Sequence, residues 1–551
     1  MRGFGVGFDL AWGERGFASC RDRGDHLVDR VADHLARGRD SGYDAVFGSL
    51  QPKGRAWLDI RDYQQAWDDF AARTEGFAIR TLHHTLLDLG AIEPYDRSRI
   101  LALTNALIDR CGFAWVNEDL GLWSLRGHPL AYPLPPLLDE PGLAAAIRNV
   151  DEVAAGLRAP LLVEFPGFSQ GASLRIGELD AYDFLRRLAE ATGVGVTLDV
   201  GHLLSWRWLI GERGESLFAE LDRLPLAHCV EIHLSGCTIV GERFFDDHRG
   251  VLLDEQFELL ERLLPRCPGL RVVTYEDPAL AEDGSLAPEC RASQARLRAI
   301  VEAWQAGEAA IEPAPAPVDL DRPAFAFDEA GERAERLERV LFAGELDPTI
   351  DPESAAAIRE LLITELLQRS HRGSGTLADR FPRTLAAWRA RRPDDPELRE
   401  LGSAFLASPQ HAEHRELPFT GLGTCLEDAF ARFAAAIDLG DPDEREVEWL
   451  AAVILALVVD RDPAFELPSF VRRAPQGWYA ITRSQPPVLH AALAGRYVSG
   501  PLTELLAAVL RRPDEPERVA AELAVGPTTL ASVCERLAAM GLRERGVALD
   551  A

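Results

Sequence analysis

Side chains that can bind a metal gather near the middle of the sequence, most of them close behind short apolar runs. They are Asp199, His202, His233, Asp246 and His248. A single residue of this kind is more often a helix cap or a satisfied core histidine than a ligand. Several of them at successive strand ends reverse that expectation, because a barrel places its chemistry at one end of its strands. We therefore expect a metal site in this region.

The first two apolar runs in this region are short and β-branched, as in buried parallel strands. Similar runs alternate with amphipathic helical patterns up to about residue 305, and eight strands are predicted, at residues 5–8, 45–49, 78–83, 114–117, 160–164, 196–199, 229–234 and 271–275. Helices are expected between them, for example at 98–110, 143–155, 181–191 and 254–264. This order predicts a (β/α)8 TIM barrel. A doubly wound open sheet is less favoured, because no Gly-rich phosphate loop follows the first strand.

The composition changes after the predicted barrel. The stretch Glu-Pro-Ala-Pro-Ala-Pro at 312–317 predicts a stiff, extended linker that cannot form a core. Beyond residue 328 the pattern is mostly helical, with helices at 354–367, 385–390, 398–406, 425–437 and 447–457 and a short strand at 478–481. The predicted domains are a barrel at 1–305, a linker at 306–325, a helical domain at 326–465 and a winged-helix-like tail at 466–551.

The tail has a pattern of its own. Three helices are predicted at 502–510, 516–523 and 528–540, and a β-wing is expected to start at 541–545. This is the pattern of a winged helix-turn-helix. A generic three-helix subdomain fits the same residues equally well.

The totals exclude several functional classes. A chain of 551 residues is too long for one core, and its net charge of −29 argues against nucleic acid or an anionic membrane as a partner. The 8 cysteines form no CxxC pair, which favours a reducing compartment over a disulfide framework. The N-terminus shows no signal-peptide core, and the most apolar run is too short to span a bilayer. We expect a cytoplasmic protein, with a homodimer as the assembly.

Short motifs at the predicted strand ends carry further information. In chain order they are LHHTLLDLG at 82–90, NEDL at 117–120, VEF at 163–165, LDVGH at 198–202, EIHLSG at 231–236, DDH at 246–248 and YED at 275–277. They resemble LHGxxLSLG, SEHL, VEN, LDxNN, EIHLAG, DTH and IEWD of the multinuclear non-heme iron-dependent oxidative enzymes (the MNIO family). The resemblance covers roughly residues 3–300. It implies a TIM-barrel enzyme that modifies ribosomally made precursor peptides.

The resemblance also implies a ligand set, with Glu164 in a bridging position. The ligand positions are His83, Asp119, Glu164, Asp199, His202, His233, Asp246, His248 and Glu276. Imidazoles and carboxylates without thiolates suit iron. By resemblance, two or three iron ions in the Fe(II) and Fe(III) states act with O2. The substrate side chain, often a cysteine, coordinates one iron and loses a hydrogen from its β-carbon.

Four positions depart from the family motifs. Asp119 replaces a histidine, His202 and Phe165 each replace an asparagine, and Cys237 replaces a second histidine. One imidazole is therefore traded for a carboxylate, and another is gained elsewhere. Such a ligand set is compatible with chemistry different from that of other family members.

The residues expected to carry the chemistry are Asp199, His233 and Glu118. Glu118 is predicted to orient a ligand histidine from outside the ligand set, although a solvated loop acid is an equally good interpretation. Trp206 and Trp208, just after His202, could line the substrate cleft or belong to the core.

Three functions compete. The first is oxidative tailoring of a precursor peptide, with the C-terminal half replacing a separate substrate-binding partner by adding a peptide strand at the edge formed by 479–481 and the wing. The second is a divalent-metal isomerase of the xylose-isomerase type or an endonuclease-like barrel, which Asp199 and His202 would suit. The third is a regulator that binds DNA through its tail, which the acidic charge disfavours.

Overall fold

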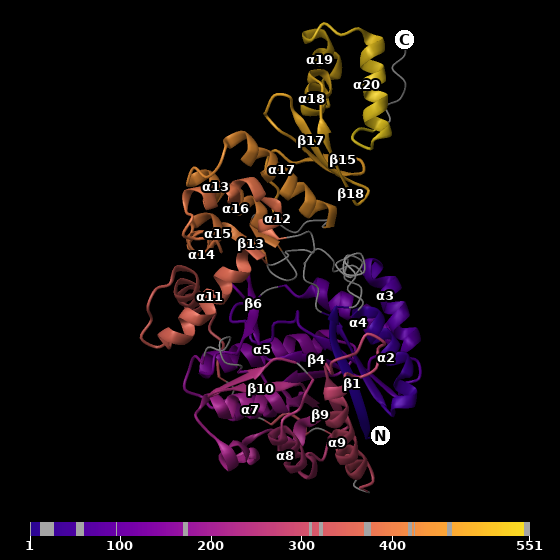
Figure 1. Ribbon diagram of the computed structural model, residues 1–551, viewed down its shortest axis with the longest axis vertical. Coiled ribbons are helices and arrows are strands. Elements are labelled where there is room, and N and C mark those ends of the chain that lie inside the picture. The colour runs from indigo at the N-terminus through magenta and orange to yellow at the C-terminus, as the bar shows by residue number, and fades with distance from the viewer. Residues whose placement is uncertain are drawn as a thin grey trace. The chain divides into compact units, whose positions relative to one another are not determined.

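Eight parallel strands close into a barrel in the computed structural model, and strands that follow one another in sequence lie side by side (Figure 1). The strands are β1 (Gly3–Ala11), β2 (Ala45–Leu50), β3 (Ile79–His84), β4 (Val116–Asp119), β7 (Leu161–Glu164), β8 (Gly195–Asp199), β9 (Cys229–Leu234) and β12 (Val272–Glu276). They correspond to the eight predicted strands, so the TIM-barrel prediction is confirmed.

The register of these strands brings the predicted ligands to the same level. Asp119 at the end of β4 lies opposite Glu164 of β7, and Asp199 of β8 lies opposite His233 of β9. Because all strands run in one direction, their carboxyl ends open on the same face of the barrel.

Helices follow the strands as the amphipathic patterns predict. They are α2 (Leu27–Ser41), α3 (Ile60–Arg73), α4 (Ser98–Cys111), α5 (Glu140–Gly156), α6 (Ala181–Thr192), α7 (Val200–Leu209), α8 (Asp254–Leu263) and α9 (Pro288–Gln305). Helix α6 shows why such segments begin and end where they do. Asp180 caps its first turn by accepting from the Tyr182 backbone N–H at 2.9 Å, and Gly193 ends it in a left-handed conformation.

Two hairpins are inserted between the barrel elements. They are β5 (Leu122–Leu125) with β6 (His128–Leu134), and β10 (Cys237–Val240) with β11 (Arg243–Asp246). Each forms its own two-stranded sheet after a barrel strand, β4 or β9. Both insertions therefore extend from the carboxyl-end face of the barrel.

The structure describes residues 2–11, 27–50, 60–94, 96–168, 175–248, 250–307, 311–313, 315–318, 323–368, 376–416, 421–423, 425–459 and 466–544. The chain divides into two compact units, and the unit with the barrel extends to Leu361. Within the described residues, no helix combines the length and apolar character needed to cross a bilayer.

The described part of the Pro-rich stretch lies against the barrel. The backbone N–H of Glu312 donates to Pro268 O at 3.0 Å, and that of Val318 donates to Glu190 O at 2.8 Å. Residues 308–310, 314 and 319–322 of the predicted linker lie outside the described residues. The barrel unit continues through α10 (Phe327–Glu338) and a π-helical turn, η6 (Arg339–Ala343). The domain limits at 305, 325 and 465 stay predictions.

The second unit begins with helices that share one apolar core. Its helices are α11 (Pro352–Gln368, which the unit boundary divides), α12 (Leu377–Arg380), α13 (Pro382–Arg391), α14 (Arg399–Leu406), α15 (Pro409–Glu413), α16 (Leu426–Ala436) and α17 (Pro442–Val459), with a small hairpin of β13 (His414–Glu416) and β14 (Gly421–Gly423). The helical prediction for this region is confirmed.

A four-stranded antiparallel sheet follows in the order β15-β16-β17-β18. Its strands are β15 (Arg472–Ala474), β16 (Gly477–Ile481), β17 (Val488–Leu493) and β18 (Arg496–Pro501), and the helices α18 (Glu504–Arg511), α19 (Pro516–Glu522) and α20 (Pro527–Ala539) complete the chain. One apolar cluster joins α17 to this sheet, and another joins the sheet to the last three helices. The sheet therefore shares its core with elements on both sides.

Two details of the predicted tail differ in the structure. Residues 479–481 belong to β16, which lies between β15 and β17, so Tyr479 is paired on both sides and only Ala480 and Ile481 extend beyond β15. Residues 541–544 form a turn in place of a wing strand, and Arg545 lies outside the described residues. The turn packs on the sheet instead, because the Gln476 backbone N–H donates to Gly541 O.

His490 of β17 gives the second unit a pH-dependent stability. Its ring is 2% exposed and Nδ1 lies 2.6 Å from the Tyr497 hydroxyl, and burial lowers its pKa to about 4. An unfolded histidine titrates near pH 6.5, so stability is full above that pH and is lost as the pH falls toward 4.

We expect the free energy of unfolding of this unit to fall by about 3 kcal/mol across that interval, and His490→Leu to remove this decrease. Urea titrations at several pH values measure it. Tyr497→Phe is the control, because it keeps the buried imidazole and with it the pH dependence. An unchanged pH profile in His490→Leu would contradict the account.

Candidate metal centre

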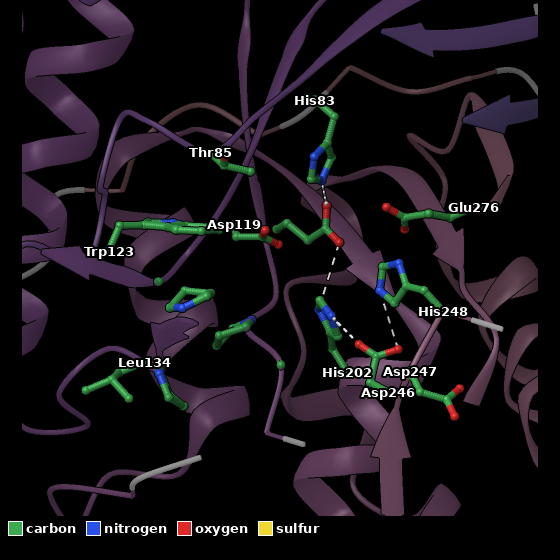
Figure 2. Close-up of a pocket in the computed structure, with 16 residues that line it drawn as sticks. His83, Thr85, Asp119, Trp123, Leu134, His202, Asp246, Asp247, His248 and Glu276 are labelled. Carbon is green, nitrogen blue, oxygen red and sulfur yellow. Dashed lines mark hydrogen bonds and ion pairs between the residues drawn. The ribbon is translucent and has the colours of Figure 1, made fainter. Parts of the chain in front are cut away.

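All nine predicted ligands converge near the carboxyl ends of the barrel strands. Figure 2 labels several of them that line a pocket there, namely His83, Asp119, His202, Asp246, His248 and Glu276. Their ligand atoms form four overlapping groups, each with all atoms within 4.8 Å of one another. The groups are His83, Glu164 and His233; Glu164, Asp199, His233 and Glu276; Asp119, Glu164 and His202; and His202, Asp246 and His248. Glu164 belongs to three of the four groups, which is the place a bridging carboxylate would occupy.

The two departures from the family motifs at ligand positions lie in one group. Asp119 and His202 meet there beside Glu164. The carboxylate of Asp119 and the imidazole of His202 therefore belong to the same candidate metal group. This group still contains both types of ligand.

The two carboxylate oxygens of Asp199 have different surroundings. Oδ1 caps α7 by accepting from the His202 backbone N–H at 2.7 Å. Oδ2 is buried and makes no hydrogen bond within the described residues. The helix cap and the metal-ligand interpretation of this residue are therefore compatible.

His233 also has polar atoms without a hydrogen bond. Nδ1 lies 3.2 Å from Glu164 Oε2 and 3.4 Å from Glu276 Oε2, yet within the described residues it has no hydrogen-bond geometry to either. A buried imidazole nitrogen that lacks a hydrogen bond and faces two carboxylates fits a cation between them. The described residues therefore suit a metal ion at this point.

The pKa shifts of the buried ligands also indicate a site for positive charge. Burial lowers the pKa of His233, but the carboxylates of Glu164, Glu231 and Glu276 outweigh it and hold that pKa well above its usual value. Burial raises the pKa of Glu164, but His233 and His83 hold it well below its usual value. The buried carboxylates therefore need compensating positive charge, which protons or metal ions can supply.

Residues outside the ligand set hold several ligand rings. Glu231 lies 3.2 Å from Nε2 of His233, and it also accepts from Trp115 Nε1 at 2.7 Å and Thr274 Oγ1 at 2.6 Å. Asp277 lies 3.1 Å from Nδ1 of His248. Such outer partners fix ring orientation and tautomer in metal sites.

The role of Glu231 was not predicted from the sequence, although the spacing of residues on β9 indicates it. It lies two residues before His233 on the same strand, and alternate residues of a strand share a face. A carboxylate at that spacing from a ligand histidine is placed to contact its ring.

Glu118 does not contact a ligand histidine in the predicted way. Its carboxylate lies 3.2 Å from Nδ1 of His84 and accepts from the backbone N–H groups of Leu87 and Asp88, each at 3.2 Å. The ring of His84 in turn lies 2.9 Å from Thr104 Oγ1. Glu118 therefore fixes the loop after β3.

A cavity of about 370 Å³ opens over the ligands. Its lining includes His83, Asp119, Glu164, His202, Asp246, His248 and Glu276. Trp206 and Trp208 do not line it: the ring of Trp206 packs at a tilt against Phe168, and Trp208 Nε1 donates to Glu242 O at 2.8 Å. Trp123 lines the cavity instead. It belongs to the β5–β6 hairpin, which was not predicted from the sequence.

Phe47 supports two ligand rings from within the barrel. Its ring centroid lies 5.2 Å from that of His83 and 5.7 Å from that of His233. Gly7 of β1 makes room for it, because a Cβ there would lie 1.8 Å from Phe47 Cε1. Glycine at position 7 therefore permits the stacking.

We expect Gly7→Ala to displace Phe47 and to lower the free energy of unfolding of the barrel by about 1–3 kcal/mol. Urea titration measures this change. Gly331→Ala in α10 is the matched control, because nothing lies within 4 Å of the added Cβ and alanine favours a helix. Equal stability of Gly7→Ala and wild type would show that Phe47 is not constrained in this way.

Comparisons with known proteins identify relatives of the barrel. The family model for the RiPP precursor modification enzyme MbnB/TglH/ChrH matches residues 60–298. A UPF0276 protein of Caulobacter vibrioides is 30% identical over 269 residues, which are 47% of this chain and 90% of that protein. A UPF0276 protein of Chromobacterium violaceum is 30% identical over 225 residues, 39% of this chain and 76% of that protein.

Solved structures show weaker similarity. An L-ribulose 3-epimerase gives a TM-score of 0.34 with 17% identity, covering 55% of this chain and 96% of that chain. Endonuclease IV from Thermus thermophilus gives a TM-score of 0.32 with 18% identity, covering 55% of this chain and 99% of that chain. These values add nothing about activity. The sequence relationships confirm the resemblance: the chain belongs to the MNIO family, the RiPP precursor modification enzymes described as MbnB/TglH/ChrH.

Proposed function

We propose that this protein oxidatively modifies a ribosomally synthesised precursor peptide, with iron and O2, at a cysteine or another side chain that coordinates iron. The observation that carries the proposal is the convergence of nine imidazole and carboxylate side chains in four overlapping groups, three of which contain Glu164. Membership of a family of RiPP precursor modification enzymes supports a precursor peptide as the substrate. Iron would supply the redox chemistry, with O2 accepting the electrons removed from the peptide.

The ligand groups divide into a deep part and a part open to the cavity. The side chains of Asp199 and His233 are each 1% exposed and do not line the cavity. His202 and His248, with side chains 12% and 30% exposed, do line it. Asp199 and His233 would therefore anchor iron, and a substrate side chain would meet the group of His202, Asp246 and His248 first.

Charge in the cavity argues against phosphorylated sugars, which the isomerase alternative would include. The described residues that line it carry carboxylates and imidazoles but no Lys or Arg. A phosphate group is normally held by such cations or by a helix N-terminus. The lining is better suited to a neutral peptide.

We predict more than one iron atom per chain, and a loss of iron in His233→Ala. Glu231→Gln should weaken iron binding about 10- to 100-fold, because the partner of the His233 ring loses its charge. Metal analysis by mass spectrometry and competition with a chelator measure both effects. The exposed Glu242→Gln is the control and should bind iron as wild type does. A single zinc per chain that is insensitive to His233→Ala would contradict the proposal.

The C-terminal unit is proposed to bind the precursor peptide at the outer edge of β18. Among the described strands, β18 pairs only with β17, and Val498 on it is 38% exposed. A free edge needs only backbone groups to accept a peptide strand. The alternative, DNA binding by α20, has little support, because Arg536 is the one basic residue of that helix.

We predict that the full chain binds a precursor peptide encoded nearby, and that Val498→Lys weakens this binding about tenfold, because an edge charge opposes strand addition. Fluorescence anisotropy with labelled peptide measures it. Val240→Lys is the control, at an exposed valine of the β10–β11 hairpin. Tight binding to duplex DNA that weakens steeply with salt would favour the regulator hypothesis instead.

A further inference from the structure

The cavity over the ligands has two chemically different sides. Figure 2 shows Trp123 and Leu134 on one side and His202, Asp246, His248 and Glu276 on the other. Pro133 and Pro135 flank Leu134 in sequence and also line the cavity, and Asp119 is the ligand that lies beside Trp123. We call Trp123, Pro133, Leu134 and Pro135 the apolar wall. A substrate side chain on the ligand side would place its neighbours in the peptide against this wall.

The hairpin that carries most of the apolar wall is held firmly at its base. Asp88 accepts from the Trp123 backbone N–H at 2.8 Å and from Ser124 Oγ at 2.7 Å. Arg97 fixes the loop around Asp88, donating from Nε to Leu87 O at 2.7 Å and from Nη2 to Asp88 O at 3.1 Å. These contacts fix the backbone at Trp123 and the start of the hairpin.

The far end of the hairpin is held by the segment that follows the barrel. Arg126 Nε lies 2.8 Å from Glu338 Oε2, and the ring of His128 packs edge-on against Phe342 at 5.1 Å. Because both ends are fixed, the apolar wall is a preformed surface and does not require closure of a lid. Preformed apolar surfaces bind ligands without a cost of ordering.

We propose that Trp123 determines specificity by stacking on a large apolar side chain next to the residue that is oxidised. The inference rests on the proposed function. An acidic neighbour would be rejected, since a carboxylate against the apolar wall would lose its water without meeting a Lys or Arg of the described lining. A cavity of about 370 Å³ takes a short stretch of extended peptide.

Calorimetric titration of the iron-loaded full chain tests this. The probes are N-acetylated, amidated dipeptides in which cysteine is joined to phenylalanine, alanine or aspartate, each made in both orders. We expect the phenylalanine peptide to bind at least about tenfold more tightly than the aspartate peptide in one order. Trp123→Ala should reduce the ratio of affinities for the phenylalanine and alanine peptides about tenfold. Trp123→Leu should reduce this ratio by less.

Trp208→Ala is the matched control, a tryptophan truncated outside the cavity, and should keep the wild-type preference. Equal affinities for phenylalanine and aspartate peptides, absence of binding by all of them, or a preference unchanged in Trp123→Ala would overturn the role of Trp123. A thiolate-to-iron absorption band is recorded in the same samples. If binding shows the preference but no band forms, coordination of cysteine in the proposed function fails while the role of Trp123 stands.

Discussion

The buried charge around Glu164 is the constraint on which the rest of the barrel depends. Carboxylates from several strands meet imidazoles at ligand-atom separations below 4.8 Å, with little access to water. Carboxylates buried in this way are unfavourable unless cations compensate them. The parallel register, the cap on α7 and the stacked ring of Phe47 all serve to hold these groups together. We interpret the barrel as a scaffold for several metal ions at one point.

The sequence predicted those parts of the fold that depend on local pattern. Buried parallel strands are short apolar runs, so all eight barrel strands were located, and the family resemblance then placed the candidate ligands near their ends. The direction of individual side chains was harder to predict. His83 and His84 are neighbours on β3 and point to opposite sides, and so do Glu118 and Asp119 on β4. Glu118 therefore meets His84, outside the ligand set.

Features that depend on pairing between distant segments could not be predicted. The residues at 479–481 read as a strand, but their inner place in the sheet depends on partners that no local pattern identifies. The turn of the β5–β6 hairpin has one signal in the sequence, the glycine at position 127. In the structure both Arg126 and Gly127 adopt positive φ at this turn. Nothing in that signal shows that Trp123 would face the ligands. Its place follows from Asp88, which is distant in sequence.

We propose that Glu164 joins more than one iron ion. Mössbauer spectroscopy of the full chain, loaded with the Mössbauer-active iron isotope, tests it most directly when wild type is compared with Glu164→Gln. Our account predicts at least two iron sites with coupled spins in the wild type, and loss of that coupling in the variant, because the bridging carboxylate is gone. A single, uncoupled iron site in the wild type would contradict it.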